Sequence, residues 1–187
     1  MNAAATPRDR GGEGVIRIRA EQPQDAAAVR RVLMSAFPSP AEADLVEQLR
    51  AGGKMAVSLV AESEDVIIGH VAFSRVSFAP PLDYLAYGLG PLAVMPGHER
   101  HAAGRRLVQN GLAACRALDA WMVVVLGDVG YYSRFGFAPA SRHGLLNEFG
   151  AADTFMVFML KARAHPPPAT LVKYAPEFTA LARGAHL

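Results

Sequence analysis

The stretch Leu89-Gly-Pro-Leu-Ala-Val-Met95 is an apolar run that stops at Pro96-Gly97, and a helical pattern follows from Arg105 to about Leu118. A second apolar run, Met122 to Leu126, leads through a turn into Tyr131-Tyr-Ser-Arg-Phe-Gly-Phe137. This order predicts a βαβ unit, because parallel strands need a crossover that is usually a helix. The turn before the helix brings backbone N–H groups to a helix N-terminus, which predicts an anion site there.

The segments on either side extend this unit into a larger sheet. Hydrophobic periodicity predicts helices over Asp25–Ala36 and Ala41–Arg50 and a short helix within Val129–Phe135. It predicts strands over Val15–Arg19, Met55–Ala61, Val66–Phe78 with a bulge or bend at Gly69, Tyr84–Met95 and Thr154–Leu160. Mostly antiparallel strands followed by one parallel crossover predict an α/β (α+β) three-layer domain, not a doubly wound nucleotide fold.

Length and composition predict one ordinary globular domain. The chain has 187 residues, of which 51% are hydrophobic and 19% are charged. We expect residues 1–14 to be a disordered leader and 15–164 to be the domain. Residues 165–187 are expected to be a Pro-rich spacer and a tail that packs back on the domain. The Leu145, Leu146 and Phe149 segment is expected to be a loose apolar loop.

Charge and cysteine content exclude several classes of protein. The formal net charge of +2 and the lack of interleaved aromatic and basic residues argue against a nucleic-acid partner. No apolar stretch approaches the roughly 18 residues of a membrane span, so we expect no membrane partner. The single Cys115 fits a reducing compartment, which predicts a cytoplasmic protein. No His, Cys, Asp and Glu spacing suggests a metal site.

Three segments, taken in this order, resemble the GNAT superfamily of acetyl-CoA-dependent N-acetyltransferases, and most closely its YhbS-like bacterial branch. They are Leu89–Pro96 with Gly104-x-x-Leu107-Val108, Val124–Asp128 with Tyr131–Phe137, and Lys173-Tyr174 with Phe178. The resemblance covers much of Val15 to Phe178. It implies a GNAT-like mixed, mostly antiparallel sheet of about six to seven strands with helices on both faces.

The resemblance also implies which residues bind acetyl-CoA, the co-substrate. In the family, a loop of the form Gln/Arg-x-x-Gly-x-Gly/Ala lets the backbone approach the pyrophosphate of coenzyme A. The backbone of the preceding strand pairs with the pantetheine arm, and one N–H faces the thioester carbonyl as an oxyanion donor. The matching positions here are Leu92, Ala93, Val94, Glu99, Arg100, His101, Ala102, Ala103, Gly104 and Arg105.

Two of these positions depart from the family pattern. Glu99 replaces the usual Gln or Arg, and a carboxylate beside a pyrophosphate is unfavourable unless it points away. Ala102 replaces the usual Gly, and alanine is tolerated only where φ is negative. Arg105 and Arg106 are retained, and they partly offset the acidic residue.

For catalysis, the resemblance implies direct attack of a primary amine on the thioester, without an acyl-enzyme. Tyr132 matches the tyrosine that protonates the leaving thiolate, and Tyr131 is the second candidate. Packing against Phe135 and Phe137 is the alternative role of Tyr132. Asp128 is expected to cap the short helix, where many members have an Asn that binds the cofactor.

The sequence leaves the acceptor side open. The weak candidates for a general base are Asp83, Glu99, His70 and His143, each explained more simply by a surface or capping role. The two N-terminal helices and the Phe78–Tyr87 loop, with Tyr84 and Tyr87, are expected to border the acceptor pocket. The partner is a small-molecule or peptide amine, and a homodimer is compatible with the sequence. The alternative function is a catalytically degenerate acyl-CoA-binding or interaction module, which the departures at Glu99 and Ala102 favour.

Overall fold

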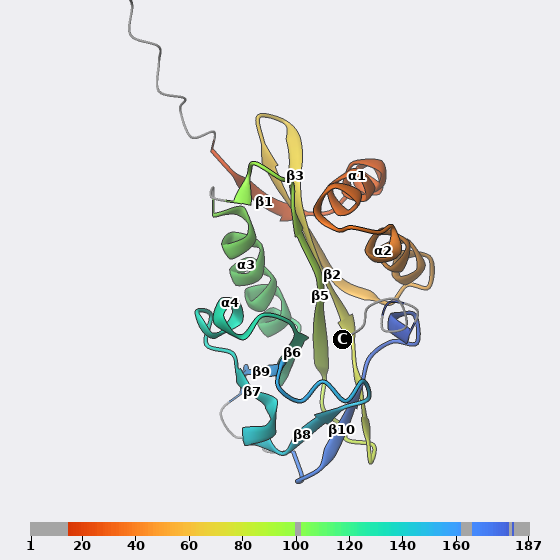
Figure 1. The fold of residues 1–187 in the computed structure, drawn as a ribbon, viewed down its shortest axis with the longest axis vertical. Coiled ribbons are helices and arrows are strands. Elements are labelled where there is room, and N and C mark those ends of the chain that lie inside the picture. Colours follow the sequence, from red (N-terminus) through yellow and green to blue (C-terminus); the bar gives the residue numbers. More distant parts are fainter. Residues whose placement is uncertain (1–14, 100–101, 162–165, 180, 182–187) are drawn as a thin grey trace, which may run out of the picture.

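The computed structural model describes residues 15–99, 102–161, 166–179 and 181, and its main element is a seven-stranded sheet (Figure 1). The strand order is β1-β2-β3-β5-β6-β9-β7. These strands are β1 (Arg17–Ala20), β2 (Met55–Ser63), β3 (Val66–Arg75), β5 (Ala86–Val94), β6 (Met122–Leu126), β9 (Phe155–Met159) and β7 (Ala138–Pro139). Neighbouring strands are antiparallel except β5 and β6, which are parallel. The predicted fold class, mixed sheet and βαβ unit are confirmed.

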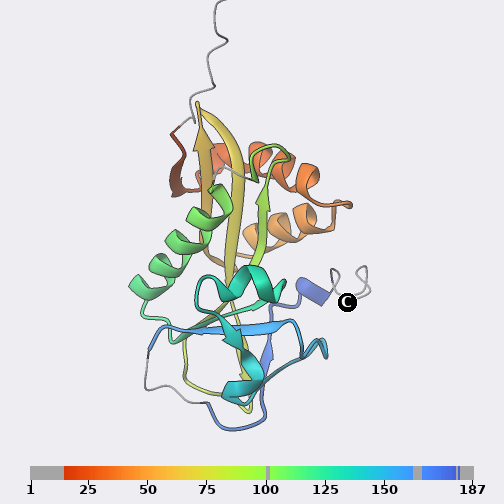
Figure 2. The same cartoon turned by 60° about the vertical axis from the view of Figure 1, so that its left-hand side comes forward.

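Helices cover both faces of this sheet. The helices are α1 (Ala26–Ala36), α2 (Ala41–Ala51), α3 (Ala103–Ala117) and the short α4 (Val129–Ser133), with 3₁₀ turns at Pro23–Asp25 and Ala140–His143. Figures 1 and 2 show α1 and α2 on one side of β3 and β5, and α3 on the other. The apolar stripe of α3 faces the sheet through Leu107, Val108, Leu112 and Cys115. Leu118, at the C-terminal cap of α3, is 44% exposed and does not belong to this stripe.

A second, three-stranded sheet lies beside the large one and was not predicted. Its order is β4-β10-β8, with β4 at Ser77–Ala79, β10 at Thr170–Lys173 and β8 at Leu145–Asn147. β10 pairs antiparallel with β4 and parallel with β8, so Leu145 and Leu146 belong to a strand and not to a loose loop. After β10, Tyr174 and Phe178 are buried in a core cluster.

Two irregularities shape β3 and β5. Near Gly69 the register with β2 shifts, because Ala61 faces Gly69 whereas Glu62 faces Ile67. The predicted bulge at Gly69 is therefore confirmed. A second shift sets Gly90 and Pro91 of β5 against the single residue Ala72 of β3. The expected leader 1–14, the loop residues Arg100 and His101, and residues 162–165, 180 and 182–187 lie outside the described residues.

Candidate active site

β5 and β6 separate halfway along β5, and this separation creates the site. β5 pairs with β6 only from Ala86 to Leu89, whereas its pairing with β3 continues to Val94. The Met95 N–H donates to the Ile68 carbonyl of β3 at 2.8 Å. Because backbone groups alternate direction along a strand, the N–H groups of Leu92 and Val94 face away from β3, toward the opening.

One cavity of about 720 Å³ lies between this strand end and the N-terminus of α3; we call it the α3 cleft. Its lining includes seven of the residues predicted to bind the cofactor, namely Leu92, Ala93, Val94, Glu99, Ala102, Gly104 and Arg105. Arg134, Tyr131 and Phe135 line the opposite wall. The structure therefore brings the predicted strand residues and the predicted loop residues to one cleft.

Of the other predicted cofactor residues, Ala103 does not line the α3 cleft. Ala103 is fully buried in the core with its side chain turned away from solvent, so only its backbone is at the helix start. Arg100 and His101 lie outside the described residues. Arg106 donates a hydrogen bond to the Ile16 carbonyl and ties α3 to the start of β1.

The two departures from the family pattern have different consequences. The Glu99 carboxylate accepts a hydrogen bond from the Gly97 N–H at 2.8 Å, so a backbone donor partly satisfies its charge. Ala102 has φ of 59° and ψ of 8°, which is the left-handed region. An L-residue other than glycine there costs roughly 1–2 kcal/mol. The condition under which alanine is tolerated, a negative φ, is not met.

Gly104 and Tyr131 meet across the α3 cleft. A Cβ atom on Gly104 would lie 2.9 Å from the hydroxyl oxygen of Tyr131 and 3.5 Å from Val94. The Arg134 guanidinium lies over the Tyr131 ring, 4.8 Å from its centroid. Gly104 therefore lets a tyrosine hydroxyl reach the first turn of α3, within a cleft that two arginines flank.

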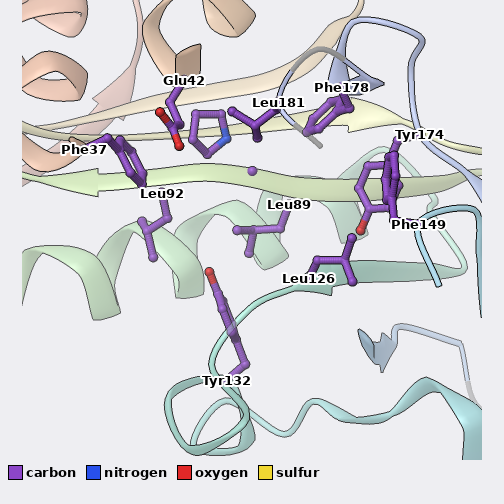
Figure 3. Close-up of a pocket in the computed structure, with 12 residues that line it drawn as sticks. Phe37, Glu42, Leu89, Leu92, Leu126, Tyr132, Phe149, Tyr174, Phe178 and Leu181 are labelled. Carbon is purple, nitrogen blue, oxygen red and sulfur yellow. The ribbon is translucent and has the colours of Figure 1, made fainter. Parts of the chain in front are cut away.

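A second cavity of about 350 Å³ adjoins the first; we call it the apolar cavity. It lies beside β5 at the separation and is lined by Phe37, Glu42, Leu89, Gly90, Pro91, Leu92, Leu126, Tyr132, Phe149, Tyr174, Phe178 and Leu181 (Figure 3). Phe37 and Leu92 line both cavities. The two cavities therefore meet at these residues.

Tyr132, the predicted acid, lines the apolar cavity and not the α3 cleft. Figure 3 shows its hydroxyl pointing toward the strand that carries Leu89 and Leu92. Its ring packs on Gly127, where a Cβ atom would lie 2.6 Å from a ring carbon, and on Phe137 at 5.6 Å between centroids. Burial raises the pKa of the Tyr132 hydroxyl above its ordinary value. The Tyr132 ring therefore packs in the core, while its hydroxyl points into the apolar cavity.

The neighbouring predictions have mixed outcomes. Asp128 caps α4 as expected, because its Oδ1 accepts from the Tyr131 N–H at 2.5 Å. Tyr84 instead stacks on Trp121 at 4.2 Å, and Tyr87 is buried in the core, so neither lines the two cavities. The expectation that their loop borders the acceptor pocket stays a prediction. The end of α1 and the start of α2 do border the apolar cavity, through Phe37 and Glu42.

Of the weak base candidates, only Glu99 lines a cavity. His70 is fully buried, and its Nε2 lies 2.9 Å from the Ser58 hydroxyl. That hydroxyl donates to Glu21, which also pairs with Arg50 at 2.6 Å. Burial lowers the pKa of His70, so it is neutral near pH 7. His70 therefore belongs to a structural network under α1 and α2 and lines neither cavity.

Sequence reasoning missed Glu42 and Tyr174 as site residues. Glu42 stands in the first turn of α2 and Tyr174 follows β10. Nothing near Glu42 in the sequence marks it, and Tyr174 is marked only as part of a segment that resembles the family. The two residues come from distant segments that meet only in the fold. Within the described residues no group of His, Cys, Asp and Glu could hold a metal ion. Among the helices that the structure describes, none is long and apolar enough to cross a membrane.

Comparisons with known proteins agree on the family. The sequence model of the acetyltransferase (GNAT) family matches residues 26–137. A protein of Escherichia coli K12, the uncharacterized N-acetyltransferase YhbS, is 38% identical over 163 residues, which cover 86% of this chain and 97% of that protein. A second protein of that strain, the uncharacterized N-acetyltransferase YjhQ, is 38% identical over 120 residues, which cover 63% of this chain and 66% of that protein.

Solved structures of similar sequence share the architecture. The crystal structure of E. coli YhbS in complex with CoA superposes with a TM-score of 0.85 at 35% identity and covers 93% of this chain and 96% of that one. A GNAT family acetyltransferase from Brucella melitensis in complex with acetyl-CoA gives 0.74 at 34% identity, covering 88% and 99%. This chain belongs to the GNAT family of acetyltransferases.

Proposed function

We propose that this protein is an N-acetyltransferase that transfers the acetyl group of acetyl-CoA to a primary amine. The observation that carries the proposal is the junction of two cavities at Leu92 and Phe37. The α3 cleft takes the thioester carrier, and the apolar cavity takes the amine. The relatives solved with CoA and with acetyl-CoA support the choice of carrier.

The residues of the α3 cleft suit coenzyme A. The outward N–H group of Val94 pairs with an amide carbonyl of the pantetheine arm, as an added strand does. The pyrophosphate lies at the N-terminus of α3, where unpaired N–H groups and the helix dipole favour an anion. Arg105 and Arg134 line the same cleft and add positive charge.

At the junction, the unprotonated amine nitrogen attacks the thioester carbonyl carbon, and a C–N bond forms as the C–S bond breaks. The Leu92 N–H stabilises the negative charge that develops on the carbonyl oxygen. Tyr132 gives its proton to the departing thiolate, which leaves as the thiol of CoA. The attacking nitrogen loses one proton to water, and the tyrosinate is reprotonated from solvent, so the cycle balances.

A thermal-shift titration with acetyl-CoA and with free CoA tests the carrier, because a ligand that binds the native state raises the midpoint. Thiol release with a panel of amines then tests transfer. We expect both a shift and amine-dependent thiol release. A shift without release over the panel favours the acyl-CoA-binding module, and no shift at millimolar ligand contradicts both functions.

A further inference from the structure

The wall of the apolar cavity is mostly hydrophobic and carries few polar groups. Of its twelve lining residues, only Glu42, Tyr132 and Tyr174 carry polar side-chain atoms. Phe149 and Phe178 flank Tyr174, with ring centroids 5.8 and 5.1 Å from its own. Burying the apolar part of a ligand against this wall stabilises the complex by about 25 cal/mol per Å² of apolar surface removed from water.

Glu42 supplies the acidic group in this wall. Its Oε2 atom is buried and has no hydrogen-bond partner within the described residues. The residue stands in the first turn of α2, but that oxygen does not cap the helix. In Figure 3 its carboxylate lies on the same side of the β5 strand as Phe37, one of the two residues at the junction. A buried carboxylate oxygen without a partner is costly, so a cationic ligand group is its natural complement.

Tyr174 supplies a second unpaired polar atom. The residue is 6% exposed, and its hydroxyl is buried without a hydrogen-bond partner in the part of the chain that the structure describes. The ring packs against Gly88, where a Cβ atom would lie 2.4 Å from a ring carbon. Glu148 holds the backbone of Tyr174, accepting its N–H at 2.8 Å. The hydroxyl is therefore fixed in place and ready for a neutral polar group.

We propose that the acceptor is a primary monoamine with an apolar body and one neutral hydrogen-bonding group. Glu42 binds the amine as an ammonium ion, which loses one proton to water before it attacks, and Tyr174 binds the neutral group. This inference rests on the proposed function for its chemistry. It adds the class of acceptor, which neither the fold nor the family membership specifies.

The same wall excludes polycationic acceptors. A second ammonium group in the apolar cavity has no carboxylate to meet, because Glu42 is the acidic residue among the lining residues. An unpaired charge removed from water costs several kcal/mol, even after relaxation and water penetration. A single neutral hydroxyl costs far less and finds the Tyr174 hydroxyl as a partner. Diamines and polyamines are therefore poor acceptors.

Three probes of equal length test the inference, namely hexylamine, aminohexanol and hexamethylenediamine. Binding is measured by calorimetry on the full chain with CoA present, and transfer by thiol release from acetyl-CoA. We expect aminohexanol to bind best, hexylamine next, and hexamethylenediamine at least tenfold more weakly than hexylamine. Tight binding or preferred turnover of the diamine overturns the inference, and it does so without touching the proposed acetyl transfer.

Variants assign the two residues. Glu42→Gln is expected to weaken hexylamine binding at least tenfold and to leave CoA binding unchanged. Glu47→Gln is the matched control, because Glu47 lies on the same helix and pairs with Arg30 at the surface. Tyr174→Phe removes only an unpaired hydroxyl and is expected to abolish the preference for aminohexanol over hexylamine. Unchanged hexylamine binding in Glu42→Gln, or a retained preference in Tyr174→Phe, overturns the assignment. If the unmodified chain does not bind CoA, that result instead contradicts the proposed function.

Discussion

The hydroxyl oxygen of Tyr131 lies 2.9 Å from the point that a Cβ atom on Gly104 would occupy. Gly104→Ala therefore pushes the Tyr131 ring from its place in the α3 cleft. The helix itself does not oppose the change, because alanine has the higher helix propensity. We expect the affinity for CoA to fall about tenfold, or about 1.4 kcal/mol, by calorimetry.

Tyr131→Phe is the partner variant for this prediction. It removes the hydroxyl that meets the new methyl group, so the double variant is expected to regain part of the lost affinity. A double-mutant cycle measures this coupling. Equal affinity in the unmodified chain and Gly104→Ala shows that the carrier does not approach the first turn of α3.

The second prediction concerns Tyr132. Tyr132→Phe keeps the ring against Gly127 and Phe137 and removes only the hydroxyl, so stability and CoA affinity are expected to stay within about twofold. General acid catalysis contributes about 10²- to 10⁴-fold, and we expect kcat to fall by about the lower figure. An unchanged kcat means that Tyr132 serves packing alone.

The pH profile gives an independent check on Tyr132. Burial raises the pKa of its hydroxyl above the ordinary value near 10. The group therefore stays protonated through the neutral and mildly alkaline range. Any alkaline decline in kcat caused by its ionisation is expected above pH 10. A decline with a midpoint below 10 that disappears in Tyr132→Phe contradicts the raised pKa.

Local patterns were enough to place the residues of the α3 cleft together, because they are neighbours in the sequence. The apolar run Met122–Leu126 predicted a strand of the βαβ unit, and β6 has these bounds, with its first four residues buried. The hydrophobic periodicity of α3 was sufficient to predict the helix that connects the two parallel strands. Turn, helix start and strand end of one βαβ unit lie close in space wherever that unit forms.

Glu42 and Tyr174 of the apolar cavity were missed because residues of this kind meet only through long-range pairing. β8 and β10 are three and four residues long and pair with each other across more than twenty residues of sequence. Strands this short carry little period-two signal. Tyr174 therefore showed only its likeness to a closing strand, and Glu42 was one charged residue on an amphipathic helix. Their unpaired atoms are visible only in the assembled cavity.

The third prediction uses Ala102, whose φ of 59° is unfavourable for alanine. Ala102→Gly relieves a backbone strain of about 1–2 kcal/mol. It also increases the entropy of the unfolded chain, which lowers the free energy of unfolding by about 0.4–1 kcal/mol. We expect a net gain in unfolding free energy of roughly 0.5–1 kcal/mol, measured by urea unfolding. CoA affinity is expected to be equal or higher, since the loop keeps its conformation. A clear loss of stability means that alanine is not strained there.

Gly111 gives a prediction in which two effects oppose each other. Replacing a mid-helix glycine with alanine normally stabilises by about 1 kcal/mol. Here a Cβ atom would lie 2.2 Å from a ring carbon of Phe73, which is fully buried. Overpacking a core costs about 1–3 kcal/mol, so we expect Gly111→Ala to destabilise on balance. Adding Phe73→Leu makes room for the methyl group and is expected to reduce the extra loss. A gain in stability from Gly111→Ala alone contradicts this packing.

The last prediction concerns the buried network of Glu21, Ser58 and His70. Burial opposes ionisation of the Glu21 carboxyl and by itself would raise its pKa. Interactions with the side chains of His70, Ser58 and Arg50 outweigh this effect and hold the pKa of Glu21 at about 2. Burial lowers the pKa of His70, despite the nearby carboxylate. In both cases the unfolded chain binds a proton at a higher pH than the folded chain does. Stability is therefore expected to fall as pH falls, first below about 6.5 through His70 and then below about 4.5 through Glu21.

Urea unfolding at a series of pH values separates the two steps. Glu21→Gln removes the carboxyl, so the variant is expected to lose the decline between about pH 4.5 and pH 2 that Glu21 causes and to keep the decline that His70 causes. Glu21→Gln also lowers stability at pH 7, by about 1–3 kcal/mol, because the charge pair with Arg50 is broken and one of the two donors, Arg50 or Ser58, loses its acceptor oxygen. Glu47→Gln, at a surface pair, is the control and is expected to change the profile little. An acid decline as steep in Glu21→Gln as in the unmodified chain contradicts the lowered pKa of Glu21.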